Sequence, residues 1–476
     1  MAQISADVVV IGGGPAGYVC AIRLSQLGRK VTVIDEAELG GVCLNRGCIP
    51  SKALIYAGSF FEKLGHASEF GIELGAKPKL SMPKLMTWKE GIVKKLTGGV
   101  GQLLKANGAT VIAGRANFTS PTTLTVTTKN GATDTLNFKN AVIATGSRPT
   151  GLKGFDIDQD GILDSTGALL QQEIPESMLC IGGGYIGLEL GTFYAKAGTK
   201  VTVVEPGTSL LASVDPELSK VVHKKLTSKG VEVKLGIGVK SQKKTQKGFE
   251  VEFSDGSKGT YRKILVTIGR TPNTNSLGLD KALVALDAKG FIKVDAARRT
   301  NQSHIFAIGD VAGQPLLAHK GSKEGVIAAE VLGGLKSIYD VKAMPAVIFT
   351  DPEIAAVGYT EAEAKAEGIA TKVGVFPFAA NGRALSVSEP DGFVKMIGDA
   401  KTGKLLGVHI VGAEASNLIA EAALAIEMGA QVEDLALTVH AHPTLPETMM
   451  EAAEAVLGHA IHIFQKKPTS APSTHA

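Results

Sequence analysis

The pattern of apolar and polar positions in this 476-residue chain repeats one arrangement twice. An apolar run at 7–11 is followed by glycines, by a stretch with helical spacing, and by a second apolar run that ends at Asp35. The same order of features returns at 178–181 and ends at Glu205. Short apolar runs separated by helical patterns predict parallel strands joined by helices. We therefore expect two α/β units of one design.

Each predicted turn from strand to helix carries the glycine pattern G-x-G-x-x-G. The first turn contains Gly12, Gly14 and Gly17, and the second contains Gly182, Gly184 and Gly187. The first glycine of such a turn permits the tight bend, the second lets backbone amides approach a pyrophosphate, and the third lets the helix pack on the strand. The acids Asp35 and Glu205 each follow the last glycine by 18 positions, where they can bind ribose hydroxyls. Both units are predicted to bind dinucleotides.

Glu205 also bears on the choice of nucleotide. A carboxylate at this position binds a free 2′-hydroxyl and repels a 2′-phosphate. The second unit is therefore predicted to prefer NAD over NADP.

The remaining patterns predict further strands. Apolar runs with glycine turns at 141–149 and 264–273 indicate returning strands, and the alternating stretches LTVTT and FEVEF indicate small antiparallel meanders inserted in the units. From residue 344 the pattern changes to four short strands and two alanine-rich helical stretches without a glycine-rich loop. This part is predicted to be a separate α+β domain.

Composition excludes several classes of protein. Hydrophobic residues make up 44% of the chain and charged residues 20%, as in globular proteins. The net charge of +4 is not concentrated in runs, so neither nucleic acid nor a membrane surface is an expected partner. No targeting segment and no membrane-spanning run is recognised, which favours a cytoplasmic location. The Pro-, Ser- and Thr-rich tail, 466–476, is predicted to be disordered.

The stretch GGVCLNRGCIPSK at 40–52 holds two of the four cysteines, Cys43 and Cys48. Two thiols at this spacing can form half a metal site, a small disulfide, or an inert reduced pair. Cys20 and Cys180 fall in a predicted helix and strand, so the chain offers no second cysteine pair and no metal site is expected. A chain this poor in cysteine suits a reducing compartment, where a persistent disulfide is usually catalytic.

Local geometry favours a reactive pair. Residues five apart in a regular helix are too far apart for a disulfide, whose Cα atoms must lie within about 7 Å. Cys43 is therefore predicted to precede the helix or to lie in an irregular first turn. Pro50 indicates that the helix begins nearby, which places Cys48 at its N-terminus. The positive end of the helix dipole favours a thiolate there.

Two dinucleotide sites and a reactive dithiol together suggest electron transfer. A flavin can join the hydride chemistry of a nicotinamide to the exchange chemistry of thiols. The first unit, with the cysteines soon after its acid, is then expected to bind FAD, and the second to bind NAD. Taken alone, Asp310 is better explained as a helix cap, and His442 and Glu447 as surface residues.

The motifs taken together resemble those of the pyridine nucleotide-disulfide oxidoreductases. The match includes the cysteine stretch, both glycine turns, ATG at 144–146, IGD at 308–310 and HPTLPE at 442–447. It is closest to the members that oxidise dihydrolipoamide with NAD⁺ in 2-oxo acid dehydrogenase and glycine cleavage complexes. The resemblance implies an FAD domain at 1–150, an NAD domain at 151–273, a central domain at 274–343 that completes the FAD site, and an interface domain at 344–465.

The resemblance also implies roles for single residues. Cys43 would exchange with substrate and Cys48 would face the flavin. Lys52, beside the flavin, would pair with Glu189. His442 would be the catalytic base and Glu447 the carboxylate that orients it. Further positions matching FAD contacts are Gly114, Thr145, Gly146, Ser147, Asp310 and Ala318, and those matching NAD contacts are Tyr185, Ile186, Glu189 and Gly269.

Partners follow from the same resemblance. His442 would reach the disulfide of a second subunit, so a homodimer with shared sites is implied. The lipoyl domain of an acyltransferase or the glycine cleavage H protein would carry the substrate.

The main alternative function is that of another NAD(P)H-dependent disulfide reductase of the family, and a second alternative is a non-catalytic flavin scaffold. The sequence departs from the family at Asp35, where relatives often carry Glu.

Overall fold

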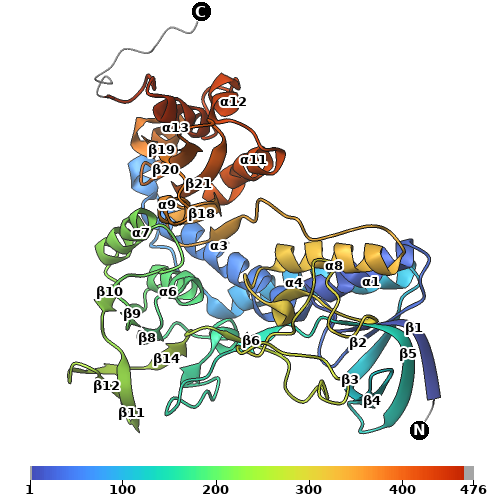
Figure 1. The fold of residues 1–476 in the computed structure, drawn as a ribbon. Coiled ribbons are helices and arrows are strands. Elements are labelled where there is room, and N and C mark those ends of the chain that lie inside the picture. Colours follow the sequence, from blue (N-terminus) through green and yellow to red (C-terminus); the bar gives the residue numbers. More distant parts are fainter. Residues whose placement is uncertain (1–2, 466–476) are drawn as a thin grey trace, which may run out of the picture.

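The structure is a computed structural model that describes residues 3–465. Figure 1 shows two α/β units side by side, with the C-terminal domain lying above them. The order of elements agrees with the two predicted nucleotide-binding units followed by an α+β domain. The tail predicted to be disordered lies outside the described residues.

The first unit is built on parallel strands with an antiparallel meander. Within residues 3–307 its six strands are β1 (Gln3–Ile11), β2 (Val31–Asp35), β3 (Thr110–Ser120), β4 (Thr123–Thr128), β5 (Thr133–Ile143) and β16 (Ile305–Ala307). β1 lies parallel to both β2 and β5, while β3, β4 and β5 pair antiparallel as predicted. Val8, Val9 and Val10 on β1 are fully buried, which explains the unbroken apolar run.

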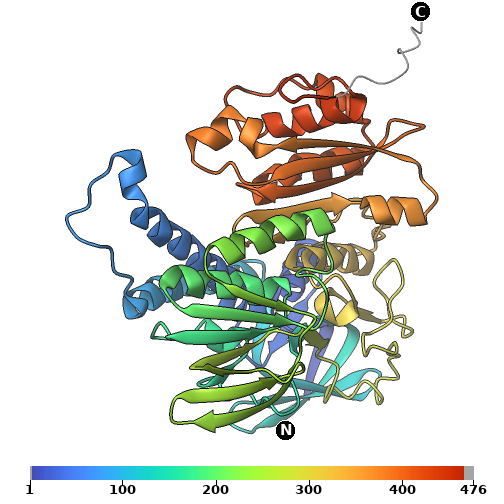
Figure 2. The same ribbon diagram turned by 90° about the vertical axis from the view of Figure 1, so that its left-hand side faces the viewer.

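Helices of the first unit cover this sheet and extend away from it. They are α1 (Pro15–Gln26), α2 (Gly41–Arg46), α3 (Cys48–Gly65), η1 (Ala67–Phe70) and α4 (Met82–Ala106). α3 leaves the first unit and packs against the second, and the loop between α3 and α4 projects from the side of the molecule (Figure 2).

The predicted central domain at 274–343 completes the first unit. Its strand β16 pairs with β5, and η2 (Gly309–Ala312) leads to α8 (Ala318–Leu332), which packs against α1. Gly325 allows this close packing, because a Cβ atom there would lie 2.6 Å from the carbonyl oxygen of Ala16. The sequence alone did not indicate that this segment would extend the first sheet.

The second unit repeats the design. Its parallel sheet has the order β10-β9-β8-β14-β7 within residues 162–266. The elements are β7 (Ile162–Leu163), α5 (Ser165–Ala168), β8 (Ser177–Ile181), α6 (Tyr185–Ala197), β9 (Lys200–Glu205), α7 (Pro216–Ser228), β10 (Glu232–Leu235) and β14 (Lys263–Val266). The predicted meander consists of β11 (Val239–Thr245), β12 (Gly248–Phe253) and β13 (Lys258–Tyr261).

The chain crosses between the two units twice at one place. β6 (Ser147–Pro149) leads into the second unit and β15 (Arg270–Pro272) leads back, and the two strands pair antiparallel. The second unit is therefore inserted into the first.

The C-terminal domain has more elements than predicted. Residues 346–412 form a five-stranded antiparallel sheet of β17 (Ala346–Ile348), β18 (Glu353–Gly358), β19 (Thr371–Pro377), β20 (Phe393–Asp399) and β21 (Leu405–Gly412). Four strands were expected, but the turn before Pro352 divides the first apolar stretch into two. The helices are α9 (Glu361–Ala366), η3 (Phe378–Ala380), α10 (Gly382–Ser386), α11 (Ala415–Met428), α12 (Val432–Leu437) and α13 (Glu447–Leu457). Within residues 3–465, no helix combines the length and apolar character needed to cross a bilayer.

Candidate active site

Both glycine turns have the shape that a dinucleotide requires. Gly12 and Gly182 have positive φ angles of 107° and 106°. A Cβ atom on Gly17 would lie 1.9 Å from the oxygen of Gly12, whereas a Cβ on Gly184 would meet nothing within 4 Å. The first and third glycines thus allow tight backbone packing, while the second leaves open space at the start of the helix. The turns therefore fit FAD and NAD pyrophosphates.

The two predicted ribose-binding acids hold these turns in place. Asp35 accepts hydrogen bonds from the backbone N–H groups of Gly13 and Ala37. Glu205 accepts them from Gly183 and Gly207, each at 2.7 Å. Both carboxylates keep lone pairs for a ribose hydroxyl, since each oxygen has a single protein donor. The shorter side chain of Asp35 therefore makes the same kind of contact as Glu205.

The cysteine stretch forms two helices rather than one. Cys43 lies inside the short helix α2, while Cys48 is the first residue of α3. Gly47 separates the helices with φ −145° and ψ −108°. The prediction that Cys48 begins a helix is confirmed. Cys43 precedes that helix, which was one of the two predicted alternatives, but the break at Gly47 also gives it a short helix of its own, which was not predicted.

Cys43 and Cys48 are free thiols in contact with each other. The hydrogen bond from Cys43 and the nearby charge of Lys52 outweigh burial and lower the pKa of Cys48 to about 7. The same hydrogen bond, together with burial, raises the pKa of Cys43. Cys48 is therefore the thiol that ionises near neutral pH, as its place at a helix N-terminus predicts.

Lys52 lies one turn after Cys48 and pairs with Glu189. Its Nζ atom is 2.7 Å from Oε2 of Glu189 and 4.6 Å from the ring centre of Phe349. The other oxygen of Glu189 accepts a hydrogen bond of 2.9 Å from the backbone N–H of Phe349. The contact between Lys52 and Glu189 implied by the resemblance is thus present. Phe349, from the C-terminal domain, was not identified from the sequence.

His442 and Glu447 form a second pair, at the start of α13. Nδ1 of His442 lies 2.9 Å from Oε1 of Glu447, and the N–H of Thr444 donates to Oε2 at 2.7 Å. Burial raises the pKa of Glu447, but these hydrogen bonds outweigh it and hold the pKa below its usual value. His442 itself is 78% exposed, and no hydrogen bond or ion pair within residues 3–465 joins it to either cysteine. The pair is thus available to a second subunit.

The segment between the units brings several predicted FAD positions together. Ser147 donates a hydrogen bond to Asp310, and Thr145 donates to the carbonyl oxygen of Asn273 at 2.8 Å. Arg270, which was not predicted, donates to both the hydroxyl and the carbonyl oxygen of Ser147. The other predicted cofactor positions lie on or next to the following elements: Gly114 on β3, Gly146 before β6, Ala318 at the start of α8, Tyr185 and Ile186 at the start of α6, and Gly269 before β15.

A buried ion cluster supports the turn that carries Asp310. Glu324 on α8 is fully buried and accepts a 2.7 Å hydrogen bond from the N–H of Gly309. Arg298 and Lys320 neutralise its other oxygen, at 2.9 and 3.2 Å. Sequence reasoning missed this cluster because, although Lys320 and Glu324 are neighbours on α8, only the fold brings Arg298 and the turn at Gly309 to them.

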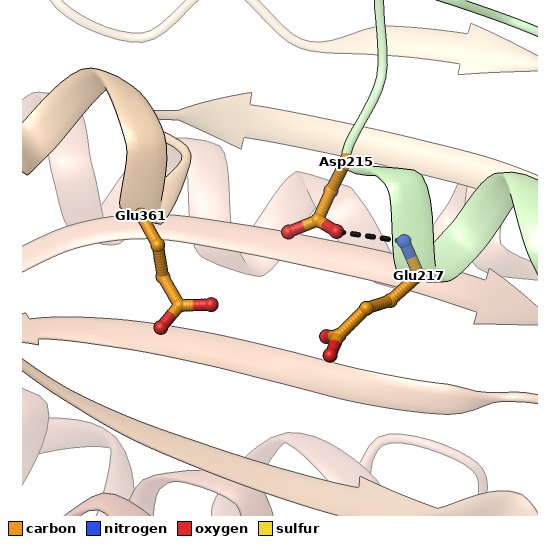
Figure 3. Close-up of side chains that lie close together, drawn as sticks. All are labelled: Asp215, Glu217 and Glu361. Atoms are coloured by element: carbon orange, nitrogen blue, oxygen red, sulfur yellow. Dashed lines mark hydrogen bonds between the residues drawn. The ribbon is translucent and has the colours of Figure 1, made fainter. Parts of the chain in front are cut away.

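Three carboxylates gather where the second unit meets the C-terminal domain. Figure 3 shows Asp215 and Glu217 at the start of α7 facing Glu361 of α9. The Nζ atom of Lys395 contacts all three of them, at 2.9 Å from Asp215 and 2.8 Å from Glu217. The lysine ammonium thus supplies the positive charge that a metal ion would otherwise provide.

Comparison with known proteins identifies the family. Residues 6–325 match the family described as pyridine nucleotide-disulphide oxidoreductase, and residues 344–453 match its dimerisation domain. The chain belongs to this family. The resemblance inferred from the sequence and the predicted fold class are thereby confirmed, and the C-terminal domain is the dimerisation domain of the family.

Similar proteins cover nearly the whole chain. The dihydrolipoyl dehydrogenase of Geobacillus stearothermophilus is 48% identical over 466 residues, which span 97% of this chain and 98% of the relative. That of Halobacterium salinarum is 46% identical over the same shares. Members of the family use FAD and NAD, and this pyridine nucleotide-disulphide oxidoreductase is an NAD-dependent flavoprotein.

Two solved structures have the same fold. LpdA from Mycobacterium tuberculosis has a TM-score of 0.89 at 29% identity, covering 95% of this chain and 99% of its own. RclA from Escherichia coli, described as an HOCl-induced flavoprotein disulfide reductase, has a TM-score of 0.85 at 26% identity, covering 94% and 99%. The arrangement of domains is thus shared along nearly the entire chain.

Proposed function

We propose that this protein oxidises the dihydrolipoyl group of a carrier protein to its cyclic disulfide and reduces NAD⁺ to NADH. The observation that carries the proposal is the pair of Cys43 and Cys48 at the break between α2 and α3, with Lys52 and Glu189 beside it. Relatives named dihydrolipoyl dehydrogenase, 46–48% identical over 97% of the chain, support this substrate over others of the family.

The proposed reaction begins at His442, which takes a proton from one thiol of dihydrolipoamide. In the oxidised enzyme, in which Cys43 and Cys48 are joined by a disulfide, the thiolate attacks Sγ of the partner subunit's Cys43, the disulfide bond to Cys48 breaks, and Cys48 leaves as a thiolate. The second substrate thiol then attacks the lipoyl sulfur of the mixed disulfide, which closes the lipoamide ring. Cys43 is released as a thiol that carries the second proton. The substrate loses two electrons, and the cysteine pair gains them.

The residues around the thiols suit these steps. The lowered pKa of Cys48 makes it the better leaving group, and the raised pKa of Cys43 lets it accept a proton. The carboxylate of Glu447 orients His442 and stabilises the imidazolium that forms. Bound FAD would accept the electron pair from the thiols and pass it as hydride to NAD⁺. Glu205 favours NAD⁺ through its negative charge.

The proposed active site is shared between two subunits. The exposed His442 and the dimerisation domain support a homodimer in which this histidine serves the partner subunit's Cys43. The substrate would arrive on a lipoyl domain of an acyltransferase or on the glycine cleavage H protein. No nucleic acid and no membrane insertion is part of the proposal.

Steady-state turnover tests the proposal. The purified protein should be yellow and should reduce NAD⁺ with dihydrolipoamide, and replacing Cys48 with Ser should retain the flavin but abolish this turnover. Reduced glutathione with NADP⁺, and oxidised glutathione with NADPH, serve as matched controls for the alternative disulfide reductase. The proposal fails if a glutathione substrate is turned over faster than dihydrolipoamide, or if the Cys48→Ser protein keeps full activity.

A further inference from the structure

Two sets of contacts join the same three parts of the molecule. The inner contact consists of Lys52 on α3, Glu189 on α6 and Phe349 of the C-terminal domain. The outer contact consists of Ser59 and Glu62 on α3, Lys196 on α6, and Asp351 of the C-terminal domain. Both sets therefore connect the first unit, the second unit and the dimerisation domain.

The inner and outer contacts are seven residues apart on both helices, and the placement of cation and anion on α3 and α6 is reversed between them. Lys52 and Ser59 are seven residues apart on α3, as are Glu189 and Lys196 on α6, so each pair lies on one face of its helix. In the inner contact the cation is on α3 and the anion is on α6. In the outer contact the anion is on α3 and the cation is on α6.

Lys196 has all of its hydrogen-bonding capacity engaged in the outer contact. Its side chain is only 8% exposed, and its ammonium lies 3.0 Å from the Ser59 hydroxyl, 3.0 Å from Glu62 and 2.6 Å from Asp351. An ammonium has three N–H donors, so each has one acceptor. Lys196 therefore fixes three parts of the molecule relative to one another.

Asp351 is two residues from Phe349, whose N–H binds Glu189. Holding Asp351 thus holds the backbone amide that orients Glu189, and Glu189 in turn orients Lys52 beside Cys48. We propose that Lys196 is a positioning residue for the Cys48 site, acting through Asp351, Phe349 and Glu189. The inference rests on the proposed function, because it assigns Lys196 a part in that reaction.

The consequence can be measured on the thiol itself. Lys52 lowers the pKa of Cys48 more than Glu189 raises it, so loosening the inner contact should raise the pKa. In reduced protein with Cys43 replaced by Ser, Cys48 is the titrating thiol, because burial raises the pKa of Cys20 and Cys180. Ultraviolet difference absorbance reports thiolate formation. Lys196→Met should lower the acid dissociation constant of Cys48 about threefold or more, and in protein with both cysteines it should slow turnover on the order of tenfold.

Matched variants separate positioning from general damage. Lys229→Met removes another lysine bound to Glu62 at 2.6 Å. Within residues 3–465 this lysine forms no hydrogen bond or ion pair with Asp351 and acts on it only through its charge, so its loss should change the titration of Cys48 much less than Lys196→Met does. Lys196→Arg keeps the charge, and a cavity of about 150 Å³ beside the residue gives the longer side chain room, so it should restore both readouts. Asp351→Asn should act in the same direction as Lys196→Met.

A double-mutant cycle tests the route. If Lys196 acts through Glu189, Lys196→Met should have little further effect in a Glu189→Gln background. The inference is overturned if Lys196→Met and Asp351→Asn both leave the Cys48 titration unchanged, or if the cycle is additive. These outcomes do not depend on the substrate. Failure of the unaltered protein to oxidise dihydrolipoamide would instead contradict the proposed function alone.

Discussion

His442, in the loop before α13, lies 2.9 Å from Glu447, the first residue of that helix, and the imidazole is exposed while the carboxylate is mostly covered. The exposed ring is accessible from outside this chain, and the covered carboxylate can hold it in one orientation.

Replacing His442 with Gln should slow dihydrolipoamide oxidation by about 10²- to 10⁴-fold, the usual contribution of a general base. Glu447→Gln should cause a smaller loss, because the histidine keeps its ring but loses the charge that stabilises the imidazolium. Steady-state kinetics with dihydrolipoamide and NAD⁺ measures both effects. His459→Gln, an exposed histidine after α13, is the control, and full activity of His442→Gln would exclude its role as base.

Subunit mixing tests whether the site is shared. Cys43→Ala and His442→Ala homodimers should both be inactive. A heterodimer isolated through two different tags contains one complete site if the histidine serves the partner subunit's cysteines, and it should show about half of the wild-type turnover per dimer. If cysteines and histidine of one chain formed each site, the heterodimer would be inactive.

The ionisation of Cys48 should depend on the hydrogen bond from Cys43. In the reduced protein, thiolate should form as the pH rises through about 7, and below that value the thiol should predominate. Cys43→Ala removes the donor and should raise the pKa of Cys48, while Cys43→Ser keeps a hydroxyl donor and should raise it less. Ultraviolet difference titration distinguishes these cases. Equal titration of the Ala and Ser proteins would show that the hydrogen bond has no influence.

Glu205→Gln should weaken the preference for NAD⁺ over NADP⁺ by about 10- to 100-fold in kcat/KM, the equivalent of one hydrogen bond to a charged group. The change removes the charge that repels a 2′-phosphate. Kinetics with each nucleotide at saturating dihydrolipoamide measures the ratio, and Glu250→Gln in the meander of the same unit is the control. An unchanged ratio would mean that Glu205 does not contact the ribose.

Lys395→Met should destabilise the junction between the second unit and the dimerisation domain. The cost should be about 3 kcal/mol, the low end for breaking a buried ion pair, because Glu217 and Glu361 are half-exposed. Burial raises the pKa of Asp215, but its hydrogen bonds and Lys395 lower it overall. The stabilisation from its ionised form is therefore present at neutral pH and is lost as the pH falls through its lowered pKa. Urea unfolding of the protein at several pH values tests this, with the exposed Lys240→Met as the control.

Sequence patterns predicted the parts of the structure that local rules determine. Both glycine turns, their acids and the meanders follow from periodicity and spacing within about 30 residues. The place of Cys48 at a helix start could be inferred from Pro50, but the separate helix around Cys43 depends on the backbone at Gly47. Because a glycine permits many backbone conformations, the interruption of the helix at Gly47 could not be predicted from the sequence.

Contacts between distant segments could not be predicted. No sequence motif marks three residues that connect the domains: Phe349, Lys196 and Lys395. Each makes its contact only because the tertiary fold brings it next to a helix of another domain. β16 is only three residues long, and nothing local marks it as a strand of the first sheet. The pairing of Lys52 with Glu189 was anticipated only through the family resemblance.

The paired strands β6 and β15 also have a consequence for biosynthesis. Residues 150–269 leave the first unit and return to it at one point, and the sheet of that unit is complete only after β16 has been added. During translation, which releases the N-terminal residues first, the inserted unit has all of its strands outside the ribosome before the surrounding unit does. The first unit, although it contains the N-terminal residues, is therefore expected to reach its native fold after the inserted second unit.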